Sequence, residues 1–326
     1  MQLDIQKTDE LAEYLAKKGW LTPNESIQSL TKPGEGNMNY TLRVTTSQRT
    51  FIIKQARPYV EKYPQIAAPD ERAVIEGRFY KKTQYLPSVG GMMPRLLGMD
   101  EASKILLLED LGEASDFTVL YQKDQKLTST EVEALAQYLV ALHQGSYQSQ
   151  PDAVFANRQM RALNHEHIFN YPFMEENGFD LDHITEGLQM VAMSYKTDTQ
   201  LKKIINDLGQ MYLSDGHFLL HGDYYPGSWL RTSQGVKVID PEFCFYGPAE
   251  FDLGVMTAHL MMAQQEEDTI RQVYQSYGHI NNPRLVDQFT GVEIMRRLIG
   301  LAQLPLSLSL LDKEELLEQA YELVMK

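Results

Sequence analysis

The sequence has little of several features that would each indicate a particular class of protein. It contains a single cysteine, Cys244, so no disulfide can form within the chain, which agrees with a reducing compartment. No stretch approaches the roughly 18 apolar residues that a membrane-spanning helix requires. The first residues lack the basic and apolar segments of a signal peptide. We therefore expect a cytoplasmic protein with no membrane partner.

Basic residues are also few relative to acidic ones. Lysine and arginine number 30 against 44 aspartates and glutamates, for a formal net charge of −14. Basic side chains occur only in short pairs such as Lys81-Lys82, whereas proteins that grip a nucleic-acid backbone carry a basic stripe. Nucleic acid is therefore not an expected partner. The acidic surface would suit a cationic substrate, or it simply keeps the protein in solution.

Two halves of different character make up the chain, which has no internal repeat and no flexible linker. Residues 40–44 and 51–54 are rich in β-branched and aromatic residues, and a turn between them predicts an antiparallel hairpin. A chain of 326 residues is long enough for two lobes. We expect an α+β fold with a small antiparallel-sheet lobe at residues 1–111 and a larger, mainly helical lobe at 112–326. Apolar spacing predicts helices at 8–18, 69–80, 130–143, 198–213, 250–264, 284–301 and 312–324, and strands at 93–98, 104–108, 218–220, 229–231 and 236–239.

Two acidic motifs follow apolar, strand-like runs in the second half. His221-Gly222-Asp223 is the first, and Ser228 stands five residues after its aspartate; Asp240 and Glu242 form the second. Phosphoryl transfer from ATP needs a carboxylate near the acceptor hydroxyl, oxygen ligands for magnesium and positive charge on the phosphates. Asp223 fits the first need, and Asp240, Glu242 and the Ser228 hydroxyl fit the second. The alternative is a pair of structural aspartates that cap turns.

These motifs resemble those of the aminoglycoside phosphotransferase and choline kinase superfamily. The similarity covers residues 221–228, 238–248 and 251–254, and it is strongest to methylthioribose kinases, which also carry a serine at the position of Ser228. The resemblance implies a protein-kinase-like two-lobed fold, ATP and Mg²⁺ as cofactors, and a small hydroxylated substrate. It also implies that Asp223 is the catalytic base and that Asp240 and Glu242 bind the metal.

A lysine in the first half fits the same chemistry. Lys54 ends an apolar strand, where a buried ammonium requires a partner. In protein kinases the corresponding lysine holds phosphates and pairs with a helix glutamate; Glu76 is the candidate, and Glu71 is the alternative. Without the acidic motifs, Lys54 would instead be a surface residue on an edge strand.

Further nucleotide-binding residues are expected in two loops. The loop before residue 40 has backbone N–H groups that suit phosphates, although alone it is an ordinary turn. The resemblance implies that the segment after residue 107 meets the adenine edge, although a buried strand that simply ends has the same residues. The expected nucleotide contacts are Gly34, Gly36, Asn37, Asn39, Lys54, Glu76, Glu109 and Leu111.

The acceptor site is expected around Asp223, Tyr224, Arg296 and Arg297. The arginine pair resembles one that methylthioribose kinases direct toward substrate; the alternative is a helix with two exposed arginines. Adjacent helical residues point about 100° apart, so at most one of the pair need face the site. The residues after Asp223 differ from the methylthioribose kinase pattern, and the segment before the arginine pair is shorter.

Three functions therefore remain open. A methylthioribose-like sugar leads as the acceptor. An aminoglycoside- or choline-type amino alcohol is the alternative within the superfamily, and a nucleotide-binding pseudokinase is the alternative from another class. A homodimer is an assembly that the sequence allows.

Overall fold

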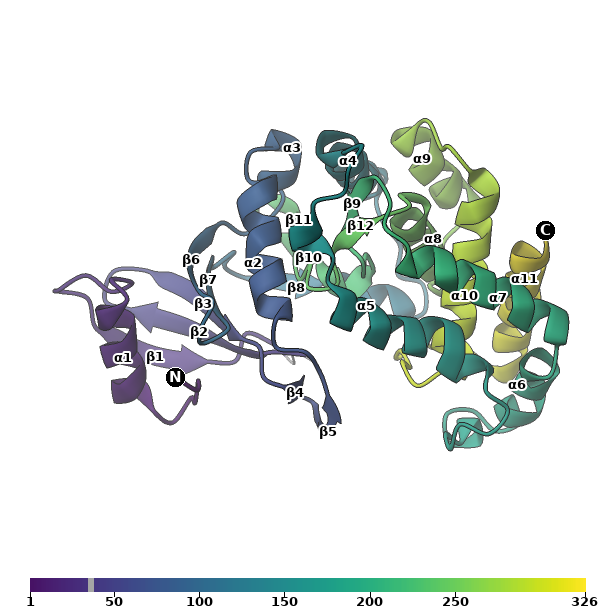
Figure 1. Cartoon of the computed structure of the whole chain (residues 1–326), viewed down its shortest axis with the longest axis horizontal. Helices are drawn as coiled ribbons and strands as arrows, with labels where there is room; N and C mark the ends of the chain where they lie inside the picture. Colours follow the sequence, from purple (N-terminus) through teal and green to yellow (C-terminus); the bar gives the residue numbers. More distant parts are fainter. Residues whose placement is uncertain (35–37) are drawn as a thin grey trace. The chain divides into compact units, whose positions relative to one another are not determined.

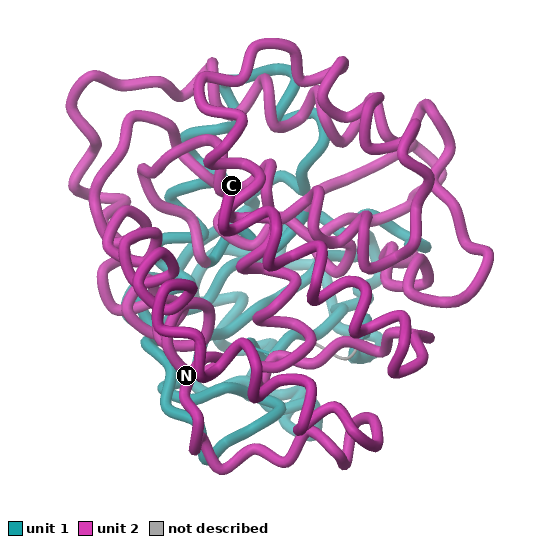
Figure 2. The backbone as a smooth tube through the Cα atoms, turned by 90° about the vertical axis from the view of Figure 1, so that its right-hand side faces the viewer, with its two compact units in different colours: residues 1–114, 239–242 teal, residues 115–238, 243–326 magenta. Residues whose placement is uncertain are grey.

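The computed structural model divides into two compact units, each built from more than one stretch of chain (Figure 2). Unit 1 comprises Met1–Ala114 and Ile239–Glu242, and unit 2 comprises Ser115–Val238 and Phe243–Lys326. The structure describes residues 1–34 and 38–326. Residues 239–242 thus belong to unit 1, although the chain on both sides of them belongs to unit 2.

Unit 1 is built on a five-stranded antiparallel sheet with the strand order β1-β2-β3-β7-β6 (Figure 1). The expected hairpin forms as β2 and β3, and its buried residues alternate along β2 as a half-buried strand requires. The expected strand at 93–98 begins only at Leu96, because Pro94 cannot donate a hydrogen bond to the ladder. The elements are α1 (Thr8–Lys17), β1 (Ile27–Thr31), β2 (Tyr40–Thr46), β3 (Thr50–Gln55), β4 (Tyr59–Val60), β5 (Tyr63–Ala67), α2 (Arg72–Thr83), α3 (Pro87–Gly90), β6 (Leu96–Asp100) and β7 (Ile105–Glu109).

Unit 2 is mainly helical, with the β10–β11 hairpin and the antiparallel strand pair β9 and β12 placed among its helices. The helices expected from apolar spacing all form, with ends that differ by at most three residues. After β8 (Ala114–Asp116), the elements are η1 (Phe117–Tyr121), α4 (Ser129–Ser146), η2 (Ala153–Phe155), α5 (Arg158–His165), η3 (Glu166–Asn170), η4 (Tyr171–Phe173), η5 (Leu181–His183), α6 (Leu188–Lys196), α7 (Thr199–Leu213), β9 (Phe218–Leu220), η6 (Pro226–Ser228), β10 (Trp229–Thr232), β11 (Gly235–Val238), β12 (Phe245–Gly247), α8 (Glu250–Met262), α9 (Glu267–Tyr277), α10 (Pro283–Ile299) and α11 (Leu310–Met325).

Helix α10 is the central helix of unit 2 and packs against both α8 and α11. All its residues from Phe289 to Ile299 are buried, including three charged ones. Aromatic rings fill the neighbouring core; Phe251 and Phe289 meet edge to face with their centroids 5.3 Å apart. Such pairs add about 0.5–1.5 kcal/mol beyond their buried area. The side chains that α10 carries are therefore held on a rigid support.

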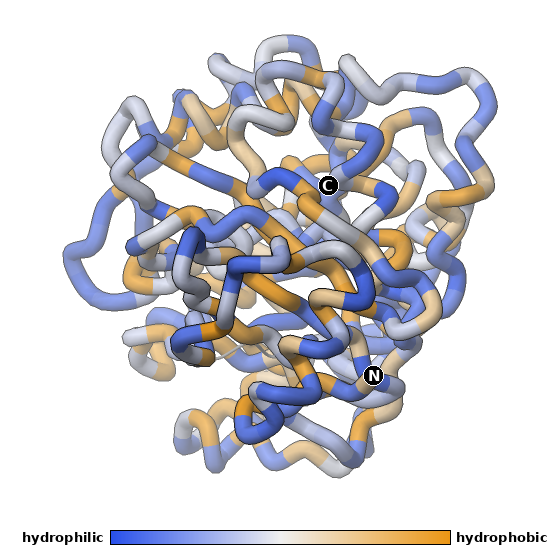
Figure 3. The backbone as a smooth tube through the Cα atoms, turned by 90° about the vertical axis from the view of Figure 1, so that its left-hand side faces the viewer, coloured by the Kyte–Doolittle hydropathy of each residue, from blue (hydrophilic) through white to orange (hydrophobic). Residues whose placement is uncertain are grey.

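Hydrophobic and hydrophilic residues alternate frequently along the backbone (Figure 3). Among the described residues, no helix combines the length and apolar character that crossing a bilayer demands.

Candidate active site

Lys54 lies in unit 1 on a central strand, not on an edge. Strand β3 pairs with β2 on one side and with β7 on the other, and Lys54 is 4% exposed. The edge-strand alternative is therefore wrong. Its Nζ lies 2.8 Å from Glu76 Oε2 on α2 and 2.6 Å from Asp240 Oδ1. Glu71, the other glutamate considered, instead pairs with Lys104.

A second buried pair adjoins these residues. Glu242 Oε2 accepts a hydrogen bond of 2.7 Å from Asn39 Nδ2 and lies 3.4 Å from Arg72 Nε. Arg72 is fully buried and also donates to Asn39 Oδ1 and to the backbone carbonyls of residues 38, 57 and 69. We call these six residues the Lys54 cluster: Asn39, Lys54, Arg72, Glu76, Asp240 and Glu242.

The Lys54 cluster brings three carboxylates to two cations. Burial opposes the charge of Lys54, but Asp240, Glu76 and Glu242 outweigh it and raise the pKa of the lysine. Burial also raises the pKa of Glu76 and of Glu242, because a carboxylate loses its hydration there. The excess of negative charge suits the addition of a cation.

Asp240 has backbone geometry that is uncommon for a residue other than glycine, although aspartate adopts it more readily than most. Its φ is +62°, in the left-handed region, where a residue with a Cβ pays about 1–2 kcal/mol. Strain of this kind persists where the surroundings fix it and is common at functional sites. The Asp240 side chain is 46% exposed, unlike its partner Lys54 at 5%.

The residues expected to bind magnesium fit that ion in part. Among residues 1–34 and 38–326, no three His, Cys, Asp or Glu side chains are arranged as a metal site. Magnesium usually needs only one or two carboxylates beside phosphates and water, and the exposed Asp240 carboxylate fits this requirement. Glu242 is more enclosed, because Asn39 and Arg72 hold its Oε2 atom.

Asp223 lies in unit 2 on a loop that begins after β9. Gly222 precedes it with a φ of +85°, and a Cβ atom there would lie 2.2 Å from the carbonyl oxygen of Phe243, so only glycine fits. The Asp252 carboxylate on α8 accepts hydrogen bonds of 2.7 and 2.9 Å from the N–H groups of His221 and Gly222. This anchorage fixes the backbone that carries Asp223.

The arginine pair on α10 is buried, so the alternative of two exposed arginines is wrong. Arg296 and Arg297 are 8% and 6% exposed, and both bind the Glu293 carboxylate, at 2.9 and 2.7 Å. Arg297 Nη2 also lies 3.5 Å from Asp223 Oδ1. Arg297 is thus the member of the pair that contacts the expected catalytic base.

Two aromatic residues extend this arrangement. His259 on α8 donates from Nε2 to Glu293 Oε1 at 3.1 Å if its Nδ1 accepts from the Tyr121 hydroxyl at 2.6 Å. Burial lowers the pKa of His259 to about 4, which agrees with a neutral ring. We call the whole set the Glu293 network: Tyr121, Asp223, His259, Glu293, Arg296 and Arg297.

Charge within the Glu293 network is balanced. Burial works against an ionised Glu293, but Arg296 and Arg297 hold its pKa well below its usual range. Burial raises the pKa of Asp223, while Arg297 and Arg296 oppose that rise. A carboxylate with a raised pKa is a better proton acceptor than one in water.

Ser228 and Tyr224 have structural contacts. Ser228, which ends η6, is 2% exposed, and its hydroxyl donates to the Asp223 carbonyl at 2.9 Å. Tyr224 is fully buried, stacks on Tyr138 and donates its hydroxyl to the Leu135 carbonyl. Packing in the core thus encloses the Tyr224 side chain, and its contact with a substrate stays a prediction.

The structure describes only some of the residues expected to bind the nucleotide. Gly36 and Asn37 lie outside the described residues, and Gly34 is exposed. Asn39 belongs to the Lys54 cluster. Glu109 ends β7 and pairs with Arg95 at 3.2 Å, and Leu111 lies in the loop that follows.

Sequence reasoning missed Arg72, His259, Glu293 and Tyr121. Glu293 stands three and four residues before the arginine pair, and this helical spacing was the available signal for that residue. His259 and Tyr121 are separated by 138 positions, and no local pattern connects them.

The chain is similar in sequence to known phosphotransferases. A model of the phosphotransferase enzyme family matches residues 29–288. The chain is 26% identical over 377 residues to a protein named methylthioribose kinase from Geobacillus sp. (strain WCH70), covering 95% of this chain and 88% of the relative. It is 29% identical over 253 residues to a methylthioribose kinase from Bacillus cereus (strain G9842), covering 74% of this chain but only 62% of the relative.

Structural similarity extends over nearly the whole chain. The crystal structure of LicA in complex with AMP matches with a TM-score of 0.55 and 13% identity, covering 98% of both chains. At that identity the match bears on the fold alone, which is the protein-kinase-like fold expected from the motifs.

Proposed function

Because the chain belongs to the phosphotransferase enzyme family, and is therefore a small-molecule kinase, we propose that it transfers the γ-phosphoryl group of ATP to a hydroxyl of a methylthioribose-like sugar. The names of the similar proteins support this acceptor. We also propose that the reaction takes place in the cytoplasm, as the single, buried cysteine suggests.

The position of Asp223 is the observation that carries the catalytic proposal. Its carboxylate is partly buried, its backbone is anchored by Asp252, and its Oδ1 lies 3.5 Å from Arg297. We propose that this carboxylate receives the proton of the acceptor hydroxyl as the oxygen attacks the γ-phosphorus and ADP leaves. Arg297 would keep Asp223 ionised before the reaction, and Arg296 would contribute further positive charge for the substrate.

The Lys54 cluster is the proposed phosphate-binding part of residues 1–111 and 239–242. Lys54 would hold the phosphates, with Glu76 fixing the lysine, since the pair is buried and in contact. Magnesium, held by Asp240 and Glu242 with Ser228 as a further candidate ligand, would offset phosphate charge. Gly34, Gly36, Asn37 and Asn39 remain proposed phosphate-loop residues, and Glu109 with Leu111 the proposed adenine contacts.

ATP turnover with a panel of acceptors tests the proposal. ADP release would be measured with and without Mg²⁺ for methylthioribose, ribose, choline, ethanolamine and an aminoglycoside. We expect Mg²⁺-dependent ADP release that methylthioribose or ribose stimulates more than the amino alcohols do. Preference for an amino alcohol would overturn the acceptor, and ATP binding with no stimulated turnover would overturn the kinase activity in favour of a pseudokinase.

A further inference from the structure

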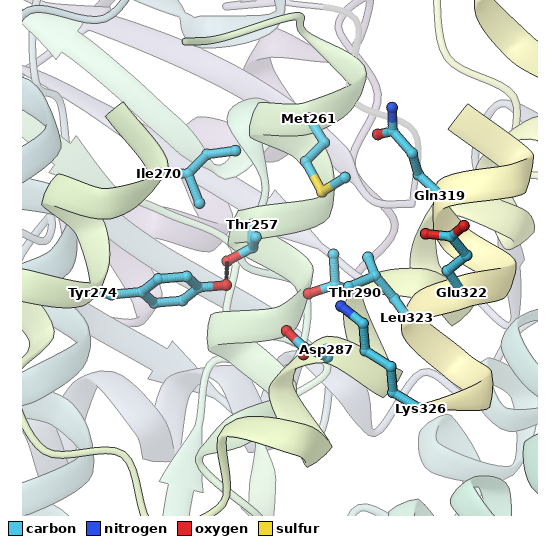
Figure 4. A pocket seen from close by; sticks show the side chains of 10 residues that line it. All are labelled: Thr257, Met261, Ile270, Tyr274, Asp287, Thr290, Gln319, Glu322, Leu323 and Lys326. Atoms are coloured by element: carbon cyan, nitrogen blue, oxygen red, sulfur yellow. Dashed lines mark hydrogen bonds between the residues drawn. The ribbon is translucent and has the colours of Figure 1, made fainter. Parts of the chain in front are cut away.

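A pocket of about 300 Å³ lies among the four last helices of unit 2 (Figure 4). Helices α8 and α10 supply Thr257, Met261, Asp287 and Thr290, and the remaining side chains come from α9, from α11 and from Lys326, which directly follows α11. None of these residues belongs to the Lys54 cluster or the Glu293 network. The remaining lining residues are Ile270, Tyr274, Gln319, Glu322, Leu323 and Lys326.

The pocket offers hydrogen-bond acceptors more than donors. Tyr274 donates its hydroxyl proton to Thr257 Oγ1 at 3.2 Å, and Thr257 donates to the carbonyl of Leu253 at 2.9 Å. Thr290 likewise donates to the carbonyl of Val286 at 2.8 Å. Each of these hydroxyl protons is thus donated within the protein. A ligand that forms a hydrogen bond with the Thr290 oxygen must therefore supply the donor group.

Asp287 adds the strongest acceptor. Its side chain is half-buried, and within the described chain its carboxylate has no hydrogen-bond or ion-pair partner. Burial raises its pKa, and Lys326 opposes that rise from a distance. With Glu322 also present, the side chains that line the pocket include two carboxylates and one ammonium, so negative side-chain charge exceeds positive. An unpaired, partly desolvated carboxylate is stabilised by a cation that donates hydrogen bonds to it.

Three apolar side chains complete the lining. Met261, Ile270 and Leu323 come from α8, α9 and α11. They provide a surface for a hydrocarbon segment of a ligand, whose burial stabilises binding. Figure 4 shows the Lys326 side chain extending toward Asp287 and Thr290. The chain thus presents its own ammonium on an aliphatic stem to the same two residues.

We propose that this pocket binds a small organic ammonium ion with a short aliphatic tail. Its ammonium group donates to Asp287 and Thr290, and its tail lies on Met261, Ile270 and Leu323. The Lys326 side chain competes for the same position and is displaced by the ligand. This site is independent of the proposed kinase reaction.

Titration of the full-length protein with n-pentylamine tests the site directly, with isosteric n-pentanol and anionic n-pentanoate as controls. The readout is the chemical shift of ¹³C-labelled methionine methyl groups. Met261 lines the pocket and reports on binding, whereas the neighbouring, buried Met262 lies outside the lining and is the internal control. We expect the amine to shift the Met261 signal saturably, and pentanol and pentanoate to bind at least about tenfold more weakly. Equal effects of amine and alcohol would overturn the proposal.

Two variants should act in opposite directions. Asp287→Asn keeps the side-chain shape but removes the charge, and it should weaken amine binding by about tenfold or more. Lys326→Met removes the competing ammonium and should strengthen amine binding. Glu318→Gln, an exposed change on α11 outside the pocket, should leave it unchanged. Unaltered affinity in Asp287→Asn, or weaker binding in Lys326→Met, would contradict the assignment. No measurement uses ATP or an acceptor, so failure here is distinct from failure of the kinase proposal.

Discussion

Asp223 is the single residue on which the proposed chemistry depends most. Replacing its carboxylate with the amide of Asp223→Asn removes proton acceptance while keeping nearly the same volume. We expect turnover to fall about 10²–10⁴-fold, the usual contribution of a general base, with little change in ATP affinity. Steady-state kinetics and nucleotide titration would measure both. Asp207→Asn, an exposed change on α7, is the matched control, and turnover that survives Asp223→Asn contradicts the assigned role.

The acidic limb of the pH profile should report on Arg297. Asp223 works only when ionised, so activity falls as the pH drops through its pKa, which burial raises and Arg297 holds down. Arg297→Met removes the nearby positive charge and should shift the acidic limb of kcat/KM to higher pH by about one unit or more. Arg297→Lys retains a charge and should shift it less. If the acidic limb of Arg297→Met stays in place or moves to lower pH, Arg297 does not control the pKa of Asp223 through its charge.

At the scale of single residues, the sequence located the chemical groups but not all their partners. Asp223, Lys54 and Asp240 were identified because each follows a strand-like run in a recognisable order. Arg72 and His259 were not, because their contacts join positions far apart in the chain. Tyr224 directly follows Asp223 in sequence, but its side chain is packed in the core, and only the tertiary structure shows this difference.

At the scale of elements, the Glu293 network links α8, α10 and η1. Glu293→Gln would leave Arg296 and Arg297 buried without their shared carboxylate. Breaking a buried ion pair in this way costs about 3–5 kcal/mol, and we expect that loss in the free energy of unfolding in urea at pH 7. Glu267→Gln, an exposed change on α9, should cost little.

The same variant has a predicted pH dependence. Because the folded state depresses the pKa of Glu293, its contribution to stability is complete above the unfolded pKa of about 4.3. That contribution is lost as the pH falls through the folded value. The difference between wild type and Glu293→Gln should therefore shrink below about pH 4. A difference that stays constant with pH would show that Glu293 stabilises by packing rather than by charge.

Element existence was more predictable than element ends. The long helix α4 follows from apolar spacing, since its buried residues repeat with the helical period. Helix α10 is buried on all sides from Phe289 to Ile299, so its length rather than an apolar face marks it as a helix. Helix α9 was missed, although Ile270, Val273, Tyr274 and Tyr277 repeat at the same period; its charged first turn resembles a loop. The late start of β6 depended on one residue, Pro94.

At the scale of the whole molecule, a division of the sequence at one point does not reproduce unit 1. Residues 239–242 supply two of the carboxylates of the Lys54 cluster from a distant part of the chain. The sequence analysis assigns these four residues to the helical half, since no change in composition shows that the chain briefly rejoins unit 1 there. The fold class was predictable because local patterns repeat, whereas this exchange of four residues depends on tertiary contacts.

A fragment of residues 1–114 should therefore not fold stably alone. Lys54 would lose Asp240, and the buried Arg72 would lose Glu242, leaving buried cations undercompensated at a cost of several kcal/mol. That is comparable to the entire stability of a small domain, about 5–15 kcal/mol. Urea unfolding followed by circular dichroism should show no cooperative transition for the fragment, while the full-length chain shows one. A cooperative fragment that binds ATP would contradict the prediction.

The shared carboxylate of Glu293 also bears on how such a protein changes over evolutionary time. One side chain pairs with two buried arginines, and Asp223 supplies the second negative charge beside Arg297, so losing any member alone leaves a charge imbalance in the core. A variant with a single substitution at position 293, 296 or 297 would therefore be poorly folded, and selection would remove most such variants. Among descendants of this chain, the three positions should be retained together or replaced together, and a lineage that has lost one of them should carry a compensating charge close by.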